Sequence, residues 1–307
     1  MRVFSKPYAF ALCFALLLTS FTVFALLDIF VVPRSVRAAE TGDAANTAGE
    51  EPEAAEADEP VITASSYTDA NISITIRRLR EYGTDIYLAD VVLSAPGYFK
   101  TALAYDTFGV NITQTTSSQA ESKDAILAVN GDYYGANRRG YVLKNGTVYR
   151  ESQRDDAEND DLVVYADGSF GLINETQVSA DELARAGAVQ LFAFGPALVQ
   201  NGSVAVSEAQ EVTARSMESG NPRTAIGVIG ELHYLFVVSD GRTEESRGLS
   251  LYQLAELMAG QGCTLAYNLD GGGSSTMVFM GEVINRPTTS GRRISEREVS
   301  DIVYIGY

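Results

Sequence analysis

The sequence predicts an α+β domain in which a strand-rich mixed sheet is accompanied by a few helices. In residues 72–79 isoleucines alternate with polar side chains, and residues 86–93 follow a similar two-residue period, which is typical of half-buried strands. Two segments, 179–186 and 250–259, instead open with helix-capping sequences. No repeat with a long period is present, which argues against solenoids and propellers.

Further strands are expected at short apolar runs that end in turn or polar residues. Residues 125–129 form such a run and end at Asn130. Residues 162–165 are followed by an Ala-Asp-Gly sequence, which indicates a hairpin. The last strand is expected at 302–305. Several predicted strands therefore border polar clusters.

The two predicted helices are bounded by residues with a clear capping chemistry. Ser179 is followed three residues later by Glu182, a capping box, and this helix is expected to end near Gly187. The second helix has the same arrangement, with Ser250 and Gln253. Helices are thus few, and strands carry most of the domain.

The N-terminal segment has the pattern of an export or membrane signal. Residues 8–27 carry no charge, follow Arg2 and Lys6, and are just long enough to span a bilayer. A possible cleavage site at Ala38 lies well beyond the apolar tract. We therefore expect residues 1–37 to be an uncleaved signal anchor, with cleavage after Ala38 as the alternative. The expected location is the cell membrane, crossed once, with the folded domain extracellular.

Residues 38–60 have the composition of a disordered acidic linker. They hold eight acidic residues, no basic residue and no large apolar side chain, so they cannot bury enough surface to fold. The folded domain is therefore expected at 61–307. The whole chain has a formal net charge of −17 and no basic run, which excludes nucleic acid as a partner.

The most informative stretch of the domain is 263–280, where an apolar run delivers Asp270 into three glycines and three hydroxyl residues. It predicts a strand, a functional loop and a second strand. Glycines allow a ligand to approach backbone N–H groups, so the loop could hold an anion. The alternative is a flexible hairpin connection. A Walker loop is excluded because the lysine is missing.

A second polar cluster follows the run 125–129. Asn130, Gly131, Asp132 and Tyr133 place an amide, a carboxylate and an aromatic ring at one strand end, which suits a sugar-sized ligand. An ordinary hairpin turn at Asn-Gly is the alternative reading.

Three further polar clusters flank predicted strands. They consist of Arg223 with Thr224, of Asp240 with Arg242, and of Ser300 with Asp301. An arginine held at the start of a strand is a natural bidentate partner for phosphate. A surface arginine and a plain Asp-Gly turn are equally ordinary interpretations.

In chain order, the segments NGDYYG, FGPALVQNG, NPRTAIGV, SDGR, NLDGGGSSTM and REVSD resemble the phosphodiester glycosidase domain. The resemblance covers residues 125–307. It implies removal of a sugar from a sugar-1-phosphodiester. Glu298 departs from the pattern, because relatives often have proline at this position.

The chemistry implied by this resemblance assigns roles to the polar clusters. The phosphate monoester is a good leaving group, so holding its charge matters more than protonating it. Arg223 and the backbone N–H groups of the glycine loop are expected to do this. The candidate catalytic residues are Asp270, Asp240, Asp132 and Arg223. The candidate substrate-binding residues are Asn130, Gly131, Tyr133, Thr224, Arg242, Gly271, Gly272, Gly273, Ser274, Ser275, Ser300 and Asp301.

Two other kinds of function remain open from the residues alone. A non-catalytic cell-wall or glycan-binding module would use the same aromatic and amide groups. A metal-dependent phosphodiesterase would gather Ca²⁺ or Mg²⁺ through aspartate oxygens, whereas zinc is disfavoured because the chain has one histidine and two cysteines. The expected partners are therefore a carbohydrate or sugar-phosphate substrate and, through residues 1–37, the membrane.

Overall fold

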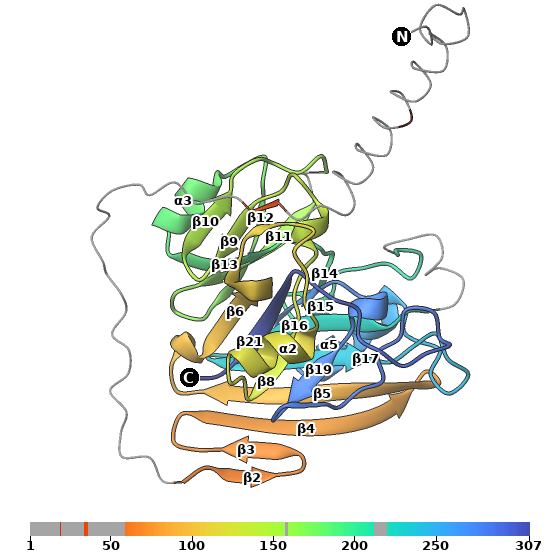
Figure 1. Ribbon diagram of the computed structural model, residues 1–307. Coiled ribbons are helices and arrows are strands. Elements are labelled where there is room, and N and C mark those ends of the chain that lie inside the picture. The colour runs from red at the N-terminus through yellow and green to blue at the C-terminus, as the bar shows by residue number, and fades with distance from the viewer. Residues whose placement is uncertain (1–18, 20–33, 36–58, 157–158, 212–219) are drawn as a thin grey trace, which may run out of the picture.

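The computed structural model describes residues 19, 34–35, 59–156, 159–211 and 220–307 (Figure 1). Most of the predicted signal anchor and most of the acidic linker lie outside the described residues. No helix among the described residues is long and apolar enough to cross a membrane. The α+β class is confirmed: this part of the chain forms several sheets and three α-helices, α2 (Thr116–Ser122), α3 (Ala180–Arg185) and α5 (Leu251–Gly260).

The largest sheet contains nine strands within the described residues, and every neighbouring pair in it is antiparallel. In spatial order the strands are β15 (Ser203–Val204), β14 (Ala197–Gln200), β18 (Leu265–Asn268), β16 (Arg223–Gly230), β17 (His233–Ser239), β5 (Thr84–Leu93), β4 (Ile72–Glu81), β3 (Ser66–Thr68) and β2 (Val61–Thr63). The alternating segments 72–79 and 86–93 thus lie within β4 and β5, which pair along their whole length.

A second sheet packs on one face of the first. Its five strands, among the residues described, are β20 (Glu282–Val283), β19 (Met277–Phe279), β8 (Leu127–Asn130), β21 (Asp301–Ile305) and β6 (Phe99–Leu103). The main hydrophobic core lies between the two sheets, where Phe236 of β17 and Val129 of β8 are both buried. The side chains next to them in β17, Leu235 and Val237, point to the opposite face and pack beneath α5. The large sheet is therefore covered on both sides.

A smaller layer lies beside this sandwich (Figure 1). It holds β12 (Phe170–Asn174), β11 (Asp160–Tyr165) and β13 (Ala188–Phe192), the hairpin of β9 (Val142–Lys144) and β10 (Thr147–Arg150), and α3. The predicted hairpin after 162–165 is confirmed by the antiparallel pairing of β11 with β12. A short pair, β1 (Arg34–Ser35) with β7 (Gly109–Val110), lies near the start of the chain.

Both predicted capping boxes are present. The Ser179 side chain accepts from the backbone N–H of Glu182, and the Glu182 carboxylate accepts from the backbone N–H of Ser179. Ser250 and Gln253 repeat this arrangement at the start of α5. Each box satisfies backbone donors that the first turn of a helix leaves without partners.

Candidate functional site

The site forms where β8 and β18 end side by side. Asn130, the last residue of β8, is fully buried and fastens three segments together. Its amide nitrogen donates to the Asp270 carbonyl oxygen at 2.7 Å, and its amide oxygen accepts from the Thr224 hydroxyl at 2.7 Å. The bonds of this side chain go to protein groups, so its geometry fits positioning of the Asp270 loop rather than contact with a substrate.

The Asp270 carboxylate is paired with Arg297 on the wall of a cavity. Its Oδ2 accepts from the Ser274 hydroxyl at 2.6 Å and from Nη2 of Arg297 at 2.8 Å. Nε of Arg297 also donates to the Ser274 hydroxyl at 2.9 Å. The exposed fractions are 17% for the Asp270 side chain and 44% for Arg297, so both reach solvent. Burial raises the pKa of Asp270, and the positive charge of Arg297 opposes this.

The glycines after Asp270 allow the loop to pack closely rather than to present a row of N–H donors. A Cβ at Gly273 would collide with Thr289, and one at Gly271 would collide with the Pro222 carbonyl. Gly272, in the short helix η4 (Gly272–Ser274), has φ of 62°, a conformation that favours glycine.

The backbone donors of this loop are largely used within the protein. The Gly272 N–H donates to the Pro222 carbonyl at 2.8 Å, and the N–H groups of Ser274 and Ser275 donate to loop carbonyls at 3.3 Å. The expectation that these N–H groups hold the phosphate therefore does not fit the geometry. The Ser274 hydroxyl and Arg297 are the donors next to the cavity.

Asp132 is the second carboxylate of the site, after Asp270. It is buried, and its two oxygens accept from the backbone N–H groups of Tyr134 at 2.9 Å and Ala193 at 3.1 Å. The buried Lys144 ammonium lies 3.7 Å from the same carboxylate and 2.7 Å from that of Asp301. Asp132 is thus fixed by three segments of the chain.

Asp301 lies beneath the site instead of in it. Its side chain is fully buried, and burial raises its pKa while the Lys144 charge lowers it. A Cβ at Gly131 would collide with the Asp301 carboxylate, which explains why glycine follows Asn130. The expectation that Gly131 and Asp301 bind substrate is therefore corrected: they pack against each other and, with Lys144, support Asp132.

A cavity of about 360 Å³ joins these groups, and we call it the active-site cavity. Five of the predicted residues line it: Asp132, Tyr133, Asp270, Ser274 and Ser300. Arg297 lines it as well. The sequence does not predict Arg297 as a site residue, although Arg297 begins the REVSD segment that resembles the family.

Arg223 does not face this cavity. Its guanidinium is buried, is ion-paired with the buried Glu211, and donates through Nε to the Leu249 carbonyl at 3.0 Å. Neighbouring residues of a strand point to opposite faces, so Thr224 reaches Asn130 while Arg223 points toward the α5 side. The predicted phosphate contact of Arg223 is therefore incompatible with its position.

Asp240 and Arg242 support the Asp270 loop from behind. Asp240 is buried, and its Oδ1 accepts from the Arg286 N–H at 2.8 Å and from Asn285 at 3.2 Å. Asn285 also donates to the Ser275 carbonyl at 3.0 Å. Burial raises the pKa of Asp240.

Arg242 bonds Asn221 at 3.0 Å and the Thr289 carbonyl at 2.6 Å, and its guanidinium lies against Gly272. Neither Asp240 nor Arg242 lines the active-site cavity, and neither do the predicted binding residues Thr224, Gly271, Gly272, Gly273 and Ser275.

Within the described part of the chain, no group of three or more histidine, cysteine, aspartate or glutamate side chains is placed to hold a metal ion. The single histidine, His233, lies 3.0 Å from Asp90 on neighbouring strands of the large sheet, away from the cavity. The acid groups of the cavity are instead paired with Arg297 and Lys144.

Comparison with known proteins identifies relatives of this chain. The family model of the phosphodiester glycosidase matches residues 123–306. The human N-acetylglucosamine-1-phosphodiester alpha-N-acetylglucosaminidase is 30% identical over 188 residues, which covers 57% of this chain and 36% of the human protein. The SPbeta prophage-derived uncharacterized protein YomE of Bacillus subtilis (strain 168) is 30% identical over 203 residues, 65% of this chain and 31% of that protein.

The chain therefore spans about a third of the length of these curated relatives. Among solved structures, the catalytic domain of the zebrafish N-acetylglucosamine-1-phosphodiester alpha-N-acetylglucosaminidase, described as auto-inhibited by its pro-peptide, superposes with a TM-score of 0.60 at 21% identity. This match covers 77% of our chain and 83% of the zebrafish chain, and it shows a shared fold. Because the family model matches more than half of this chain, the chain belongs to the phosphodiester glycosidase family.

Proposed function

We propose that this protein hydrolyses sugar-1-phosphodiesters in the active-site cavity. The observation that carries the proposal is the pairing of the Asp270 carboxylate with the Arg297 guanidinium at 2.8 Å on the wall of one cavity. This places a group able to activate water or attack a sugar beside a group able to hold a phosphate. The names of the human and zebrafish relatives support the same substrate class.

In the proposed reaction, either Asp270 accepts a proton from water while the water oxygen attacks the anomeric carbon, or Asp270 attacks that carbon itself and water then hydrolyses the resulting glycosyl ester. In both routes the bond from the anomeric carbon to the phosphate oxygen breaks. The phosphate monoester leaves with the bonding electrons, and the water oxygen ends on the sugar. Arg297 stabilises the charge that develops on the leaving phosphate. Its Nε and Nη2 are held by Asp270 and Ser274, while the described residues provide no partner for Nη1, which can bind phosphate.

Tyr133 is the proposed platform for the sugar ring. It is one of the exposed aromatic side chains, at 38%, and its ring packs edge to face on Phe194 with a centroid distance of 4.8 Å. The flat face of a fixed aromatic ring suits the apolar face of a sugar. The buried Asp132 next to it adds negative charge, which favours a sugar with cationic character in the transition state.

Replacement of Arg297 by methionine should lower kcat/KM for a sugar-1-phosphodiester at least tenfold more than for an aryl glycoside of the same sugar. The guanidinium is proposed to contact phosphate, which the aryl glycoside lacks. Steady-state kinetics on both substrates measures this difference. Equal losses on both substrates would remove Arg297 from the phosphate site.

The same variant has a second readout in the pH profile. Arg297 lowers the pKa of Asp270, so its removal should move the acid limb of kcat/KM to higher pH. The sign follows because Asp270 acts in its ionised form, which then requires a higher pH. An acid limb that stays in place would show that Asp270 does not control it.

The proposal includes export and tethering of the enzyme to the cell membrane. Its support is the uncharged tract at residues 8–27 and the acidic segment 38–60 that follows. On this account the full-length chain sediments with membranes, while the chain from residue 61 onward is soluble. If the full-length chain is expressed and its folded domain is found entirely in the medium, cleavage after Ala38 is favoured instead.

A further inference from the structure

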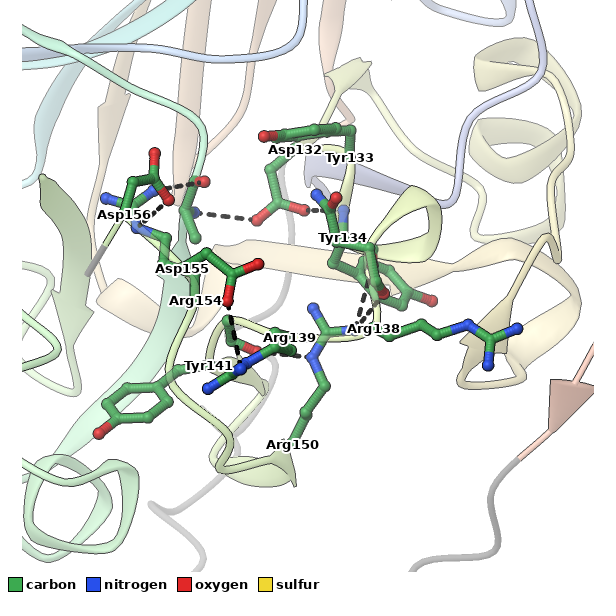
Figure 2. Close-up of a pocket in the computed structure, with 13 residues that line it drawn as sticks. Asp132, Tyr133, Tyr134, Arg138, Arg139, Tyr141, Arg150, Arg154, Asp155 and Asp156 are labelled. Carbon is green, nitrogen blue, oxygen red and sulfur yellow. Dashed lines mark hydrogen bonds and ion pairs between the residues drawn. The ribbon is translucent and has the colours of Figure 1, made fainter. Parts of the chain in front are cut away.

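A second cavity, of about 250 Å³, adjoins the active-site cavity, and we call it the arginine pocket (Figure 2). Its lining includes Arg138, Arg139, Arg150 and Arg154. The two cavities share Asp132 and Tyr133, so these two residues form the wall between them. A substrate bound over Asp132 therefore lies within reach of the arginines.

Arg150 supplies a positive charge that no carboxylate of the described residues neutralises within ion-pair distance. Its Nε donates to the Gly140 carbonyl at 2.6 Å, and its Nη1 donates to the carbonyls of Tyr134 at 3.2 Å and Asn137 at 2.6 Å. Figure 2 shows this guanidinium directed at the loop that carries Tyr134. Arg150 thus fixes that loop with neutral acceptors and leaves its charge in the pocket.

Arg139 can bind an anionic ligand because its carboxylate partner is easily displaced. It pairs with Asp155 at 3.2 Å, but the exposed fractions of the two side chains are 59% and 87%. An exposed pair of this kind contributes little stability, so an incoming oxyanion can replace Asp155 at low cost. Arg139 is also anchored through Nε to the Gln153 carbonyl at 2.9 Å, which keeps the guanidinium at the pocket.

Arg154 connects the pocket to the acidic wall of the active site. It is mostly buried and lies 2.9 Å from the buried Asp161. It donates to the Ala193 carbonyl at 2.9 Å, and the N–H of Ala193 donates to Asp132. A ligand that contacts this side of the pocket therefore lies one residue away from a group of the active site.

The charge of the pocket differs in sign from that of the whole chain. Its lining has four arginines and three aspartates, in a chain whose formal net charge is −17. One of those aspartates, Asp132, is already bonded to two backbone N–H groups and close to Lys144.

We propose that the arginine pocket is a subsite for a second phosphate group on the substrate, beyond the phosphodiester that is cleaved. This inference rests on the proposed function.

The test compares two sugar-1-phosphodiesters whose alkyl leaving groups differ only in a terminal phosphate. We expect the wild-type ratio of kcat/KM to favour the phosphorylated substrate by about tenfold, the effect of one added charge-assisted hydrogen bond. Arg139→Gln should bring this ratio close to one. Asp155→Asn should increase it, because the internal competitor for Arg139 is removed.

A matched control is Arg185→Gln, which removes an exposed arginine from α3, outside the pocket. In this variant the ratio of kcat/KM for the two substrates should stay at its wild-type value. A wild-type ratio near one, or a ratio that Arg139→Gln and Asp155→Asn change in the same direction, would overturn the subsite. The opposite signs expected for these two variants distinguish anion binding from a general disturbance of the loop.

Failure of the subsite and failure of the proposed function give different results. If neither diester is hydrolysed, the proposed function fails, and the subsite is then tested by titrating the protein with inorganic pyrophosphate while monitoring heat release. Weaker binding in Arg139→Gln and tighter binding in Asp155→Asn would support the pocket as an oxyanion site. Absence of binding to the wild-type protein would contradict it.

Discussion

Replacement of Asp270 by asparagine is expected to lower kcat on a sugar-1-phosphodiester by roughly a hundredfold or more. The amide keeps the shape of the side chain and can still accept the hydrogen bonds from Ser274 and Arg297. It removes the negative charge that activates water or stabilises a cationic sugar. Substrate binding should survive, so KM should change much less than kcat.

The matched control for this variant is Asp240→Asn. Burial raises the pKa of Asp240 as it does that of Asp270, but Asp240 is buried, accepts hydrogen bonds from Asn285 and from the Arg286 N–H behind the loop, and does not line the active-site cavity. Its replacement should affect thermal stability more than kcat. Near-wild-type turnover by Asp270→Asn, together with a large kcat loss in Asp240→Asn, would exchange the roles assigned to the two aspartates.

Replacement of Arg223 by methionine should lower the free energy of unfolding by about 3–5 kcal/mol, because it leaves the buried Glu211 carboxylate without its partner. For a domain of this size the melting temperature should fall by on the order of 10 °C. Arg297→Met, at a partly exposed arginine, should melt close to the wild type while losing activity. The two arginines thus separate stability from catalysis.

The double variant Arg223→Met/Glu211→Leu tests the cause of this loss. Removing both charges should recover much of the stability that Arg223→Met loses, because no unpaired carboxylate remains in the interior. Thermal unfolding of Arg223→Met, Glu211→Leu and the double variant gives the coupling free energy between the two side chains. If Arg223→Met has the wild-type melting temperature and loses activity only on phosphodiester substrates, Arg223 contacts the phosphate and the structural role assigned to it is wrong.

The sequence predicted those parts of the fold whose signal is local. The alternation in 72–79 and 86–93 corresponds to β4 and β5, and the capping boxes at Ser179 and Ser250 both begin helices. Helix α2 was not predicted because its sequence, TSSQAES, has almost no apolar periodicity. Tertiary packing of its few buried residues against the five-stranded sheet decides its structure.

The candidate site was predicted in part for the same reason. Asp132, Tyr133, Asp270 and Ser274 follow strand ends, and the pairing of sheets brings these ends together. The predicted phosphate contact of Arg223 is wrong because strand geometry sends the side chains of Arg223 and its neighbour Thr224 to opposite faces.

Other contributions to the site could not be read from the order of the chain. Lys144 reaches Asp132 and Asp301 from a different layer, and Arg297 meets Asp270 only through the fold of the C-terminal loop. The sequence around Lys144 contains no motif that signals these contacts. Long-range side-chain pairing of this kind depends on the packed structure.

The central claim, cleavage at the sugar carbon, is tested most directly by hydrolysis in water labelled with oxygen-18. The account predicts that the released phosphate monoester carries no label, because the water oxygen is transferred to the sugar. Mass spectrometry of the phosphate product gives the answer in a single turnover experiment. Label in the phosphate monoester would show cleavage at phosphorus and would contradict the glycosidase mechanism in favour of a phosphodiesterase.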